Sequence, residues 1–298
     1  MDQYLVMADL GGFTNLDAIK ISGAVISTYI EMYPDRSGTL SQDFRMHVTD
    51  AFPLRSGMPY FPTPVFPDLP FRQESGVADR IKAMKSRKRR PQYVSLDTVR
   101  AMARLYAESG YTSAFMGDVL GAEGTMDQTL NVEELPGVAI NPVTQESKIY
   151  TKEIARYGTD TKLWIHVDSQ EKDLLVALAA LQDSGISSRR STGLGKFKVR
   201  GARFSFSMEF TEPGLYLILS PFIPEHSDMD SIDFEKSSYT LSIFSGNDRD
   251  GKPLGVYKYF ETGSVLYLKK KLKGRWIVPG RERKRLLNFT GSFLRIGS

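Results

Sequence analysis

The chain has 298 residues, 41% of them hydrophobic and 25% charged, with a net charge of +4, which is the composition of a folded protein with one large domain or two ordinary ones. The absence of cysteine excludes disulfides, thiolate nucleophiles and cysteine-bound metals, and with only three histidines we expect no metal and no cofactor. No apolar run approaches a membrane span and the first residues lack a secretion signal, so we expect a cytoplasmic protein with no membrane partner.

The charge is concentrated in three short windows. Residues 80–90 hold seven bases and no acid, residues 184–208 hold six bases and no acid, and residues 269–285 hold nine bases and one acid. Together these windows carry a net charge of +21, which leaves −17 for the other 245 residues. Any one basic run is explained by a solvated surface. Three runs on an otherwise acidic chain indicate a protein that binds a polyanion such as nucleic acid.

The first elements in chain order are a strand, a helix and an extended segment. Residues 4–8 predict the strand, and apolar side chains at helical spacing predict a helix over 22–32. Residues 53–70 contain six prolines, a density that we expect to exclude a helix or a central strand. Such a segment either binds an aromatic-lined groove or wraps its own domain.

Two helices and a loop are predicted next. A basic helix over 76–90 ends at Pro91, and Ser95 begins a second helix that runs to about residue 107. Residues 117–137 are acidic and contain glycine, and their weak periodicity indicates a loop.

The clearest pattern follows over residues 161–185. Residues 161–167 alternate as a strand, and Asp168 with Glu171 resembles a capping box at the start of a helix. Leucines at helical spacing mark one apolar face of this helix, and Gly185 ends it.

A hairpin is predicted after the helix. Residues 196–210 form a long strand pattern whose buried face changes around Gly201, and residues 215–220 form the returning strand. Strand, helix and hairpin in this order are the first part of a ferredoxin-like βαββαβ unit. The strand and helix at the start of the chain are positioned to begin a second such unit.

A loop of basic, hydroxyl and glycine residues separates the helix from the long strand. Glycines let backbone N–H groups approach a phosphate, hydroxyls add donors, and arginine and lysine supply charge. The spacing matches neither a nucleotide P-loop nor a Rossmann fingerprint. The loop is therefore either a tight turn or a site for an RNA or DNA backbone. Its candidate RNA-binding residues are Ser188, Arg189, Arg190, Ser191, Thr192, Gly193, Leu194, Gly195, Lys196 and Lys198.

Residues 181–197 resemble the glycine-rich signature of the RAMP proteins of CRISPR–Cas systems. Three further segments are similar to those of a narrower family, the fourth subunit of the Csm complex, which is the type III-A effector. They are residues 50–53 with the prolines that follow, residues 141–151, and residues 256–264. Because these segments occur in the family's order over nearly the whole chain, the resemblance is more specific than any one motif.

The resemblance implies an α+β fold of two ferredoxin-like (RRM-like, RAMP) domains with helical and loop insertions. Residues 1–155 would form the first domain, with the proline-rich segment and the basic helix, and residues 156–298 the second, with the glycine-rich loop. Lys85 and Arg87 of the basic helix, and Tyr257 as a stacking ring, are further candidate RNA contacts.

The resemblance also implies a function. The chain would be a non-catalytic RNA-binding subunit in antiviral defence that caps the 5′ repeat-derived handle of CRISPR RNA. It would link the large polymerase-like subunit of the complex to the backbone RAMP subunit. Base pairing of the guide would read the target, so the protein needs neither an acid–base pair nor a small-molecule substrate.

Two alternatives remain open. Some RAMP relatives cleave RNA with a histidine as general acid–base, so a guide-processing endoribonuclease with His47 in that role is the first. His166 lies inside an apolar strand pattern and is interpreted as structural, and His226 is interpreted as a loop residue. The second alternative is an isolated RRM-type RNA-binding protein, for which residues 200–204 are the only support.

Overall fold

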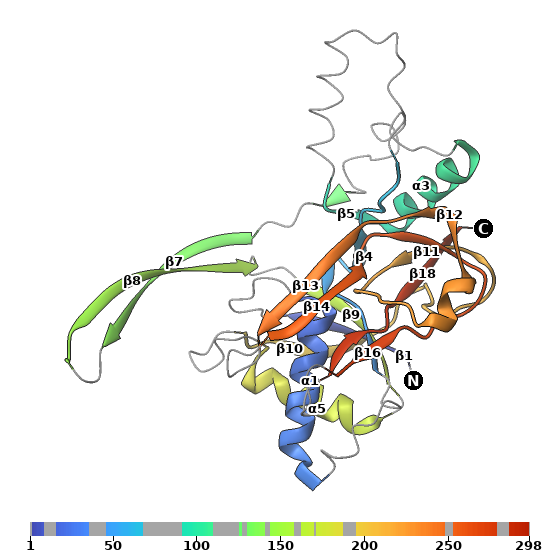
Figure 1. Cartoon of the computed structure of the whole chain (residues 1–298). Coiled ribbons are helices and arrows are strands. Elements are labelled where there is room, and N and C mark those ends of the chain that lie inside the picture. Colours follow the sequence, from blue (N-terminus) through green and yellow to red (C-terminus); the bar gives the residue numbers. More distant parts are fainter. Residues whose placement is uncertain are drawn as a thin grey trace.

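The structure is a computed structural model with two β-sheet units, from which one long hairpin projects (Figure 1). It describes residues 2–8, 16–35, 46–67, 91–109, 125–126, 130–140, 144–157, 162–169, 171–186, 195–247, 253–278 and 286–297. Among these residues, no helix is long and apolar enough to cross a membrane.

The first unit has the βαββαβ order of a ferredoxin-like fold. Its central strands lie in the order β10-β1-β9-β3, with β2 also paired to β9, and every pairing is antiparallel. If β2 and β3 are counted as one interrupted strand, this is the order 4-1-3-2 of the ferredoxin-like sheet. The elements are β1 (Asp2–Ala8), α1 (Ala18–Met32), β2 (Met46–Val48), β3 (Phe52–Arg55), β9 (Lys162–Ser169), α5 (Lys172–Ser184) and β10 (Lys198–Ala202).

Both helices of this unit cover the same face of the sheet. Asp17 caps α1 by accepting a hydrogen bond from the Lys20 N–H at 2.8 Å, and Ile21 and Val25 are buried on its inner side. Leu174 and Leu178 of α5 belong to the same buried cluster. The predicted helices are confirmed here, with α1 beginning four residues earlier than expected.

The predicted capping box of α5 is wrong. Glu171 is the N-cap residue, and its side chain makes no capping bond. Asp168 is the penultimate residue of β9 and lies opposite His47 of β2. The strand therefore extends beyond the residue at which the sequence pattern suggested it would end.

The predicted hairpin of 196–210 and 215–220 is also wrong. β10 ends at Ala202 and pairs with β1, whereas β11 (Gly214–Ile218) lies in the second sheet. The alternating phenylalanines of residues 204–210 include Phe206, which packs its ring against Trp164 at 5.5 Å. Aromatic alternation here reflects burial between the units and not strand pairing.

β9, α5 and β10 complete the unit that β1 and α1 begin, instead of starting a second one. The first sheet therefore takes strands from both sides of the expected division at 155/156. The glycine-rich loop belongs to this first unit because it connects α5 to β10.

The second unit repeats the strand order, and the described residues of its crossovers contain no α-helix. Its sheet runs β12-β15-β11-β18, all antiparallel, which is again the order 4-1-3-2. A 3₁₀ helix, η5, stands in the first crossover. The α+β fold of two ferredoxin-like units is thereby confirmed. The elements are β11 (Gly214–Ile218), η5 (His226–Ser231), β12 (Ile232–Ser238), β15 (Val265–Leu268) and β18 (Phe293–Gly297).

The proline-rich segment extends the first sheet, contrary to expectation. Pro53, Pro59 and Pro62 lie in strands, and β3 stands between β9 and β4. Each ladder here has only two or three residue pairs, so few N–H donors are required and proline is tolerated. The strands are β4 (Met58–Pro62), β5 (Tyr93–Ser95) and β6 (Thr125–Met126), and the confirmed helix after Ser95 is α3 (Leu96–Ser109).

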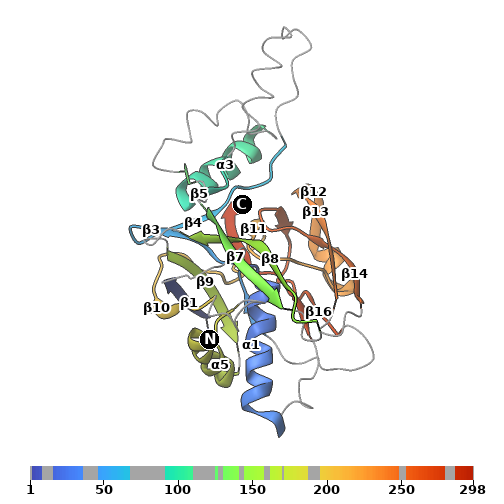
Figure 2. The same ribbon diagram turned by 90° about the vertical axis from the view of Figure 1, so that its left-hand side faces the viewer.

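Three two-stranded elements complete the described fold. β7 and β8 pair over eleven residues each, and Figure 2 shows them crossing in front of the body. β7 occupies residues that the sequence predicted as part of a loop. The pairs are β7 (Leu130–Ile140) with β8 (Ser147–Tyr157), β13 (Leu241–Asn247) with β14 (Pro253–Phe260), and β16 (Arg275–Ile277) with β17 (Leu287–Phe289).

One hydrophobic core joins the two units. The face of the first sheet opposite its helices contributes Trp164 and Phe52, which cluster with Leu217 and Leu294 of the second sheet. Trp164 is fully buried, and its indole N–H donates to the Tyr60 carbonyl at 3.0 Å. Burial of these apolar side chains from both sheets stabilises the contact between the two units.

Candidate nucleic-acid interface

Most of the predicted RNA-binding loop lies outside the described residues. This applies to Ser188, Arg189, Arg190, Ser191, Thr192, Gly193 and Leu194, and also to Lys85 and Arg87 of the basic helix. The base of the loop is described: the Ile186 N–H donates to the Gly195 carbonyl at 2.9 Å, and Gly195 has a φ of +85°. Lys196 and Lys198 follow as exposed side chains. The loop therefore starts and ends at one point, beside two exposed cations.

Tyr257 lies on a different element from this loop. It is on β14, its hydroxyl donates to the Leu254 carbonyl at 3.0 Å, and its ring centroid is 6.3 Å from that of Phe289. The structure therefore brings Lys196 and Lys198 together at the edge strand β10 and places Tyr257 on a hairpin outside that sheet.

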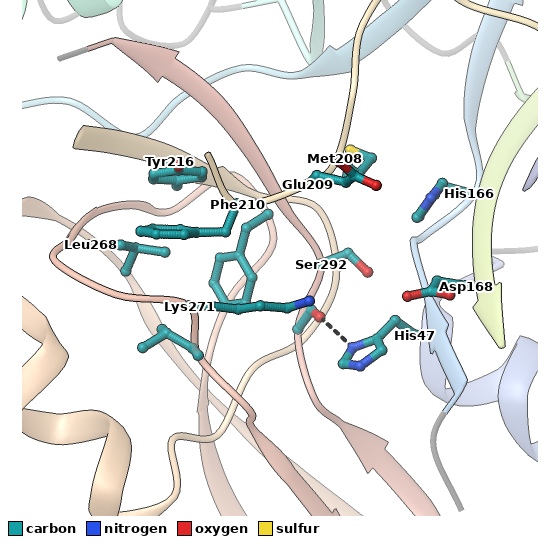
Figure 3. A pocket seen from close by; sticks show the side chains of 13 residues that line it. His47, His166, Asp168, Met208, Glu209, Phe210, Tyr216, Leu268, Lys271 and Ser292 are labelled. Atoms are coloured by element: carbon teal, nitrogen blue, oxygen red, sulfur yellow. Dashed lines mark hydrogen bonds between the residues drawn. The ribbon is translucent and has the colours of Figure 1, made fainter. Parts of the chain in front are cut away.

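A cavity of about 330 Å³, here called the junction pocket, opens where the two units meet (Figure 3). His47, His166 and Asp168 come from β2 and β9 of the first sheet, on the face that elsewhere carries Trp164. The other wall comes from the second unit and the segment before it. The lining residues are His47, His166, Asp168, Met208, Glu209, Phe210, Tyr216, Leu268, Lys271, Leu272, Gly291, Ser292 and Phe293.

The backbone of β2 and β9 positions the three polar residues of the first sheet. His47 pairs in register with Asp168, and His166 is two residues earlier on β9 and so on the same face. An interruption between β2 and β3 leaves Thr49 bonded to His166 twice: its N–H donates to the His166 carbonyl at 3.1 Å, and its hydroxyl accepts from the His166 N–H at 3.0 Å. Thr49 thus holds the backbone of His166, whose buried ring packs against Tyr4 with ring centroids 5.0 Å apart.

Hydrogen bonds to the second unit hold the remaining polar groups. The His47 Nδ1 donates to the Gly291 carbonyl at 3.3 Å, which fixes the ring tautomer when the imidazole is neutral. The Ser292 carbonyl accepts from the Leu219 N–H at 2.8 Å. The Ser292 hydroxyl is buried and makes no hydrogen bond to any described residue.

A second cavity of about 770 Å³, here called the basic pocket, shares His47 with the junction pocket. It takes its cations, Lys273 and Arg275, from the third basic window of the sequence. All three histidines of the chain therefore line the two pockets. The lining residues are His47, Glu225, His226, Ser227, Met229, Asp230, Lys273, Gly274, Arg275, Trp276 and Thr290.

One buried carboxylate shapes the basic pocket. Asp228 of η5 accepts hydrogen bonds from the N–H groups of Glu225 at 2.9 Å, Lys273 at 3.1 Å and Gly274 at 2.9 Å. Gly274 has a φ of +67°, and a Cβ there would collide with the backbone of Thr290. Asp228 thus fixes the segment that carries the two cations.

The charges in both pockets are mixed. Lys271 shares the junction pocket with Asp168 and Glu209, and the cations of the basic pocket face Glu225 and Asp230. Within the ranges given above, no three His, Asp or Glu side chains are arranged to hold a metal ion. The pockets suit a ligand with both hydrogen-bond donors and a negative group better than a simple anion.

Sequence reasoning missed both pockets. The basic window over 269–285 was recognised, but nothing in the sequence indicated that its lysines face the histidines of β2 and β9. Asp168 was assigned to a helix cap. The only available signal was that His166 and Asp168 share the parity of Trp164, which marks the strand face that the helices leave uncovered.

No protein-family model matches the sequence, and no curated protein matches it. Solved structures match by fold. A chain of the Csm3–Csm4 subcomplex of the type III-A CRISPR–Cas interference complex has a TM-score of 0.59 at 13% identity, over 99% of this chain and 100% of that chain. A chain of the Csm1–Csm4 cassette in complex with cA4 has a TM-score of 0.55 at 14% identity, over 99% and 97%.

A third match comes from a type III-B assembly. A chain of Cmr-beta bound to cognate target RNA and AMPPnP has a TM-score of 0.54 at 13% identity, over 89% of this chain and 86% of that chain. Csm4 is the component that the first two assemblies have in common. The expected resemblance is confirmed at the level of the fold: over nearly its whole length, the chain has the fold of these type III CRISPR–Cas effector subunits.

Proposed function

We propose that the chain is a non-catalytic RNA-binding subunit of a type III-A CRISPR–Cas (Csm) effector complex. In this role it caps the 5′ repeat-derived handle of the CRISPR RNA and links the large polymerase-like subunit to the backbone RAMP subunit, in antiviral defence in the cytoplasm. The observation that carries the proposal is the match over 99% of this chain to chains solved in Csm3–Csm4 and Csm1–Csm4 assemblies.

The charge distribution supports RNA as the partner. The loop between α5 and β10 carries Arg189 and Arg190, and exposed Lys196 and Lys198 follow it. Cations at a loop and along an edge strand contact a phosphate backbone without reading sequence. Because the guide RNA would read the target by base pairing, the protein would need only such sequence-independent contacts to the RNA backbone.

The test is recovery of the tagged full-length chain from its own host under mild conditions, with sequencing of the bound RNA and identification of the bound proteins. We expect CRISPR RNAs with one defined 5′ end, together with a large polymerase-like protein and a repeated RAMP subunit. Recovery of the chain alone, or with RNA of random ends, would contradict the proposal.

One observation keeps the ribonuclease alternative in view. His47 shares the junction pocket with a second imidazole, His166, and with the ammonium group of Lys271, which are groups that acid–base cleavage of RNA uses. Under the proposal, His47→Ala leaves the cleavage of a repeat RNA unchanged. Loss of cleavage in His47→Ala, with the variant still folded, would establish the alternative instead.

A further inference from the structure

The two walls of the junction pocket differ in chemistry. Figure 3 shows Phe210 and Tyr216 on one side, His47, His166 and Asp168 on the other, and Lys271 and Ser292 between them. Phe210 and Tyr216 are stacked, with ring centroids 5.4 Å apart, and the pocket surface is continued by Leu268 and Met208. Phosphate and sugar groups match the polar wall, and a flat aromatic ring matches the apolar one.

The size of the cavity limits the ligand. A volume of about 330 Å³ is at the lower end of the range for small-molecule sites, which is roughly 300–1,000 Å³. It accommodates one nucleotide and excludes a stacked pair of bases. The basic pocket beyond His47 has its own aromatic residue, Trp276, and two cations, so a strand leaving the junction pocket would enter polar surroundings.

The charges distinguish a nucleotide from a plain anion. An ionised carboxylate only accepts hydrogen bonds, so the Asp168 carboxylate in the pocket lining favours a ligand that presents donors over a bare phosphate. Ribose hydroxyls are such donors, and a carboxylate that binds them is a recurrent device in nucleotide sites. Lys271, reaching across the pocket toward His47, supplies the cation for a phosphate group (Figure 3).

Ser292 is an independent indication of a ligand. Its hydroxyl is 5% exposed and makes no hydrogen bond to the described part of the chain. Figure 3 shows it directed toward the side of the pocket that holds His166 and Asp168. Buried hydroxyls without a partner are rare in folded proteins, because each has lost its hydrogen bonds to water and gained none in exchange. A bound sugar or base would supply the missing partner.

We propose that the junction pocket binds one ribonucleotide, with its base on the Phe210 wall, its ribose hydroxyls on Asp168 and its phosphate beside Lys271. The proposal rests on the RNA-binding function only for the source of the nucleotide, which is either a residue of a bound RNA strand or a free nucleoside monophosphate. The consequence is a preference for ribose over deoxyribose that depends on Asp168.

The test compares the affinities of the full-length chain for a ten-nucleotide RNA and for the DNA of the same sequence, by fluorescence anisotropy. Wild type is expected to bind the RNA at least about tenfold more tightly, since one good hydrogen bond in a closed site contributes about 1.4 kcal/mol. Asp168→Asn keeps the shape but removes the charged acceptor, and it should lose most of this preference by weakening RNA binding alone. Ser292→Ala should weaken RNA binding by a smaller factor.

Asp183→Asn is the matched control, because it removes an exposed carboxylate of α5 that does not line the pocket, and its preference should equal that of wild type. Calorimetric titration with the four nucleoside monophosphates and their 2′-deoxy forms identifies the source. Binding of the free ribonucleotides with the same dependence on Asp168 would support the pocket with a free nucleotide as its ligand.

Three outcomes separate the two proposals. RNA binding with an unchanged ribose preference in a folded Asp168→Asn variant would overturn the nucleotide pocket and leave the RNA-binding function intact. Absence of RNA binding, together with Asp168-dependent binding of free ribonucleotides, would contradict the RNA-binding function and support the pocket. Binding of neither RNA nor free nucleotides would overturn both.

Discussion

At the scale of single residues, Asp50 connects the two units through hydrogen bonds. Its two carboxylate oxygens accept hydrogen bonds from the Ala18 N–H of α1 at 2.7 Å and from the Thr262 hydroxyl at 2.6 Å, and its own N–H donates to the Leu219 carbonyl at 2.9 Å. One residue in the gap between β2 and β3 thus joins the first unit to two segments of the second. Burial raises the pKa of this carboxyl from 3.8 to about 7, against the lowering effect of the two hydrogen bonds.

The raised pKa of Asp50 predicts a pH-dependent stability. Between about pH 4 and pH 7 the folded chain keeps a proton on Asp50 that the unfolded chain releases, so the free energy of unfolding falls as pH rises through this window and levels off above it. Asp50→Asn stays neutral and can keep both partners. The stability of wild type relative to Asp50→Asn should therefore fall by about 2–4 kcal/mol from pH 4.5 to pH 7.5, as measured by urea unfolding.

Asp183→Asn, in which an exposed carboxylate of α5 is removed, provides the correction for the loss of one surface charge. A stability difference between wild type and Asp50→Asn that does not change with pH would show that the Asp50 carboxyl is not desolvated at the junction of the units.

Gly274 is predicted to tolerate no side chain. Its φ of +67° already disfavours other residues, and a Cβ would collide with the backbone of Thr290. Gly57 is the control, because it has a similar φ of +81° but nothing within 4 Å of the added Cβ. Gly57→Ala should cost about 1 kcal/mol, and Gly274→Ala at least twice as much, in denaturant unfolding. Equal losses of stability in Gly57→Ala and Gly274→Ala would show that the backbone around Gly274 moves to accommodate the added methyl group.

At the scale of elements, RNA binding by the glycine-rich loop stays a prediction, since the structure describes only the two ends of the loop, joined by the Ile186–Gly195 hydrogen bond. Reversal of charge at Arg189 and Arg190 should weaken RNA binding whatever the RNA sequence. Each lost phosphate contact should flatten the slope of log K against log salt by about 0.7. The measurement is a salt titration of RNA affinity, with charge reversal at the exposed Arg104 of α3 as control. An unchanged slope in the loop variant would remove the loop from the interface.

The elements also show where sequence patterns mislead. Helical spacing found α1, α3 and α5 because each helix buries one face, and the apolar spacing of that face is visible within a short stretch of sequence. The phenylalanines of 204–210 alternate like a strand because they fill the junction of the units, and the prolines of β3 and β4 sit in ladders too short to exclude them. The places of these phenylalanines and prolines in the fold depend on residues far away in the sequence.

At the scale of the whole molecule, the shared core predicts one unfolding transition. Trp164 and Phe206 pack with Leu217 and Leu294, so neither sheet keeps its inner face covered without the other. Tryptophan fluorescence and far-UV circular dichroism should give coincident urea transitions. Trp164→Ala should lower the midpoint of both equally, at a cost of about 3–5 kcal/mol. Two separate transitions would show that the units fold independently.

The sequence by itself determined the composition class, three helices, the strands β1 and β9 of the first unit and the segregation of positive charge. These follow from short-range periodicity and from counting. It also indicated the resemblance that the fold comparisons confirmed at the level of the fold, at 13% identity to a chain of the Csm3–Csm4 subcomplex.

Only the tertiary structure decided which strands share a sheet and which side chains share a pocket. β1 and β9 are about 160 residues apart in sequence, yet they are hydrogen-bonded neighbours, and the junction pocket joins His47 to Ser292 across the whole chain. Such pairings depend on burying the uncovered face of one sheet against the other, an energy that no local window contains. The candidate nucleotide site therefore became visible only when both units were in place.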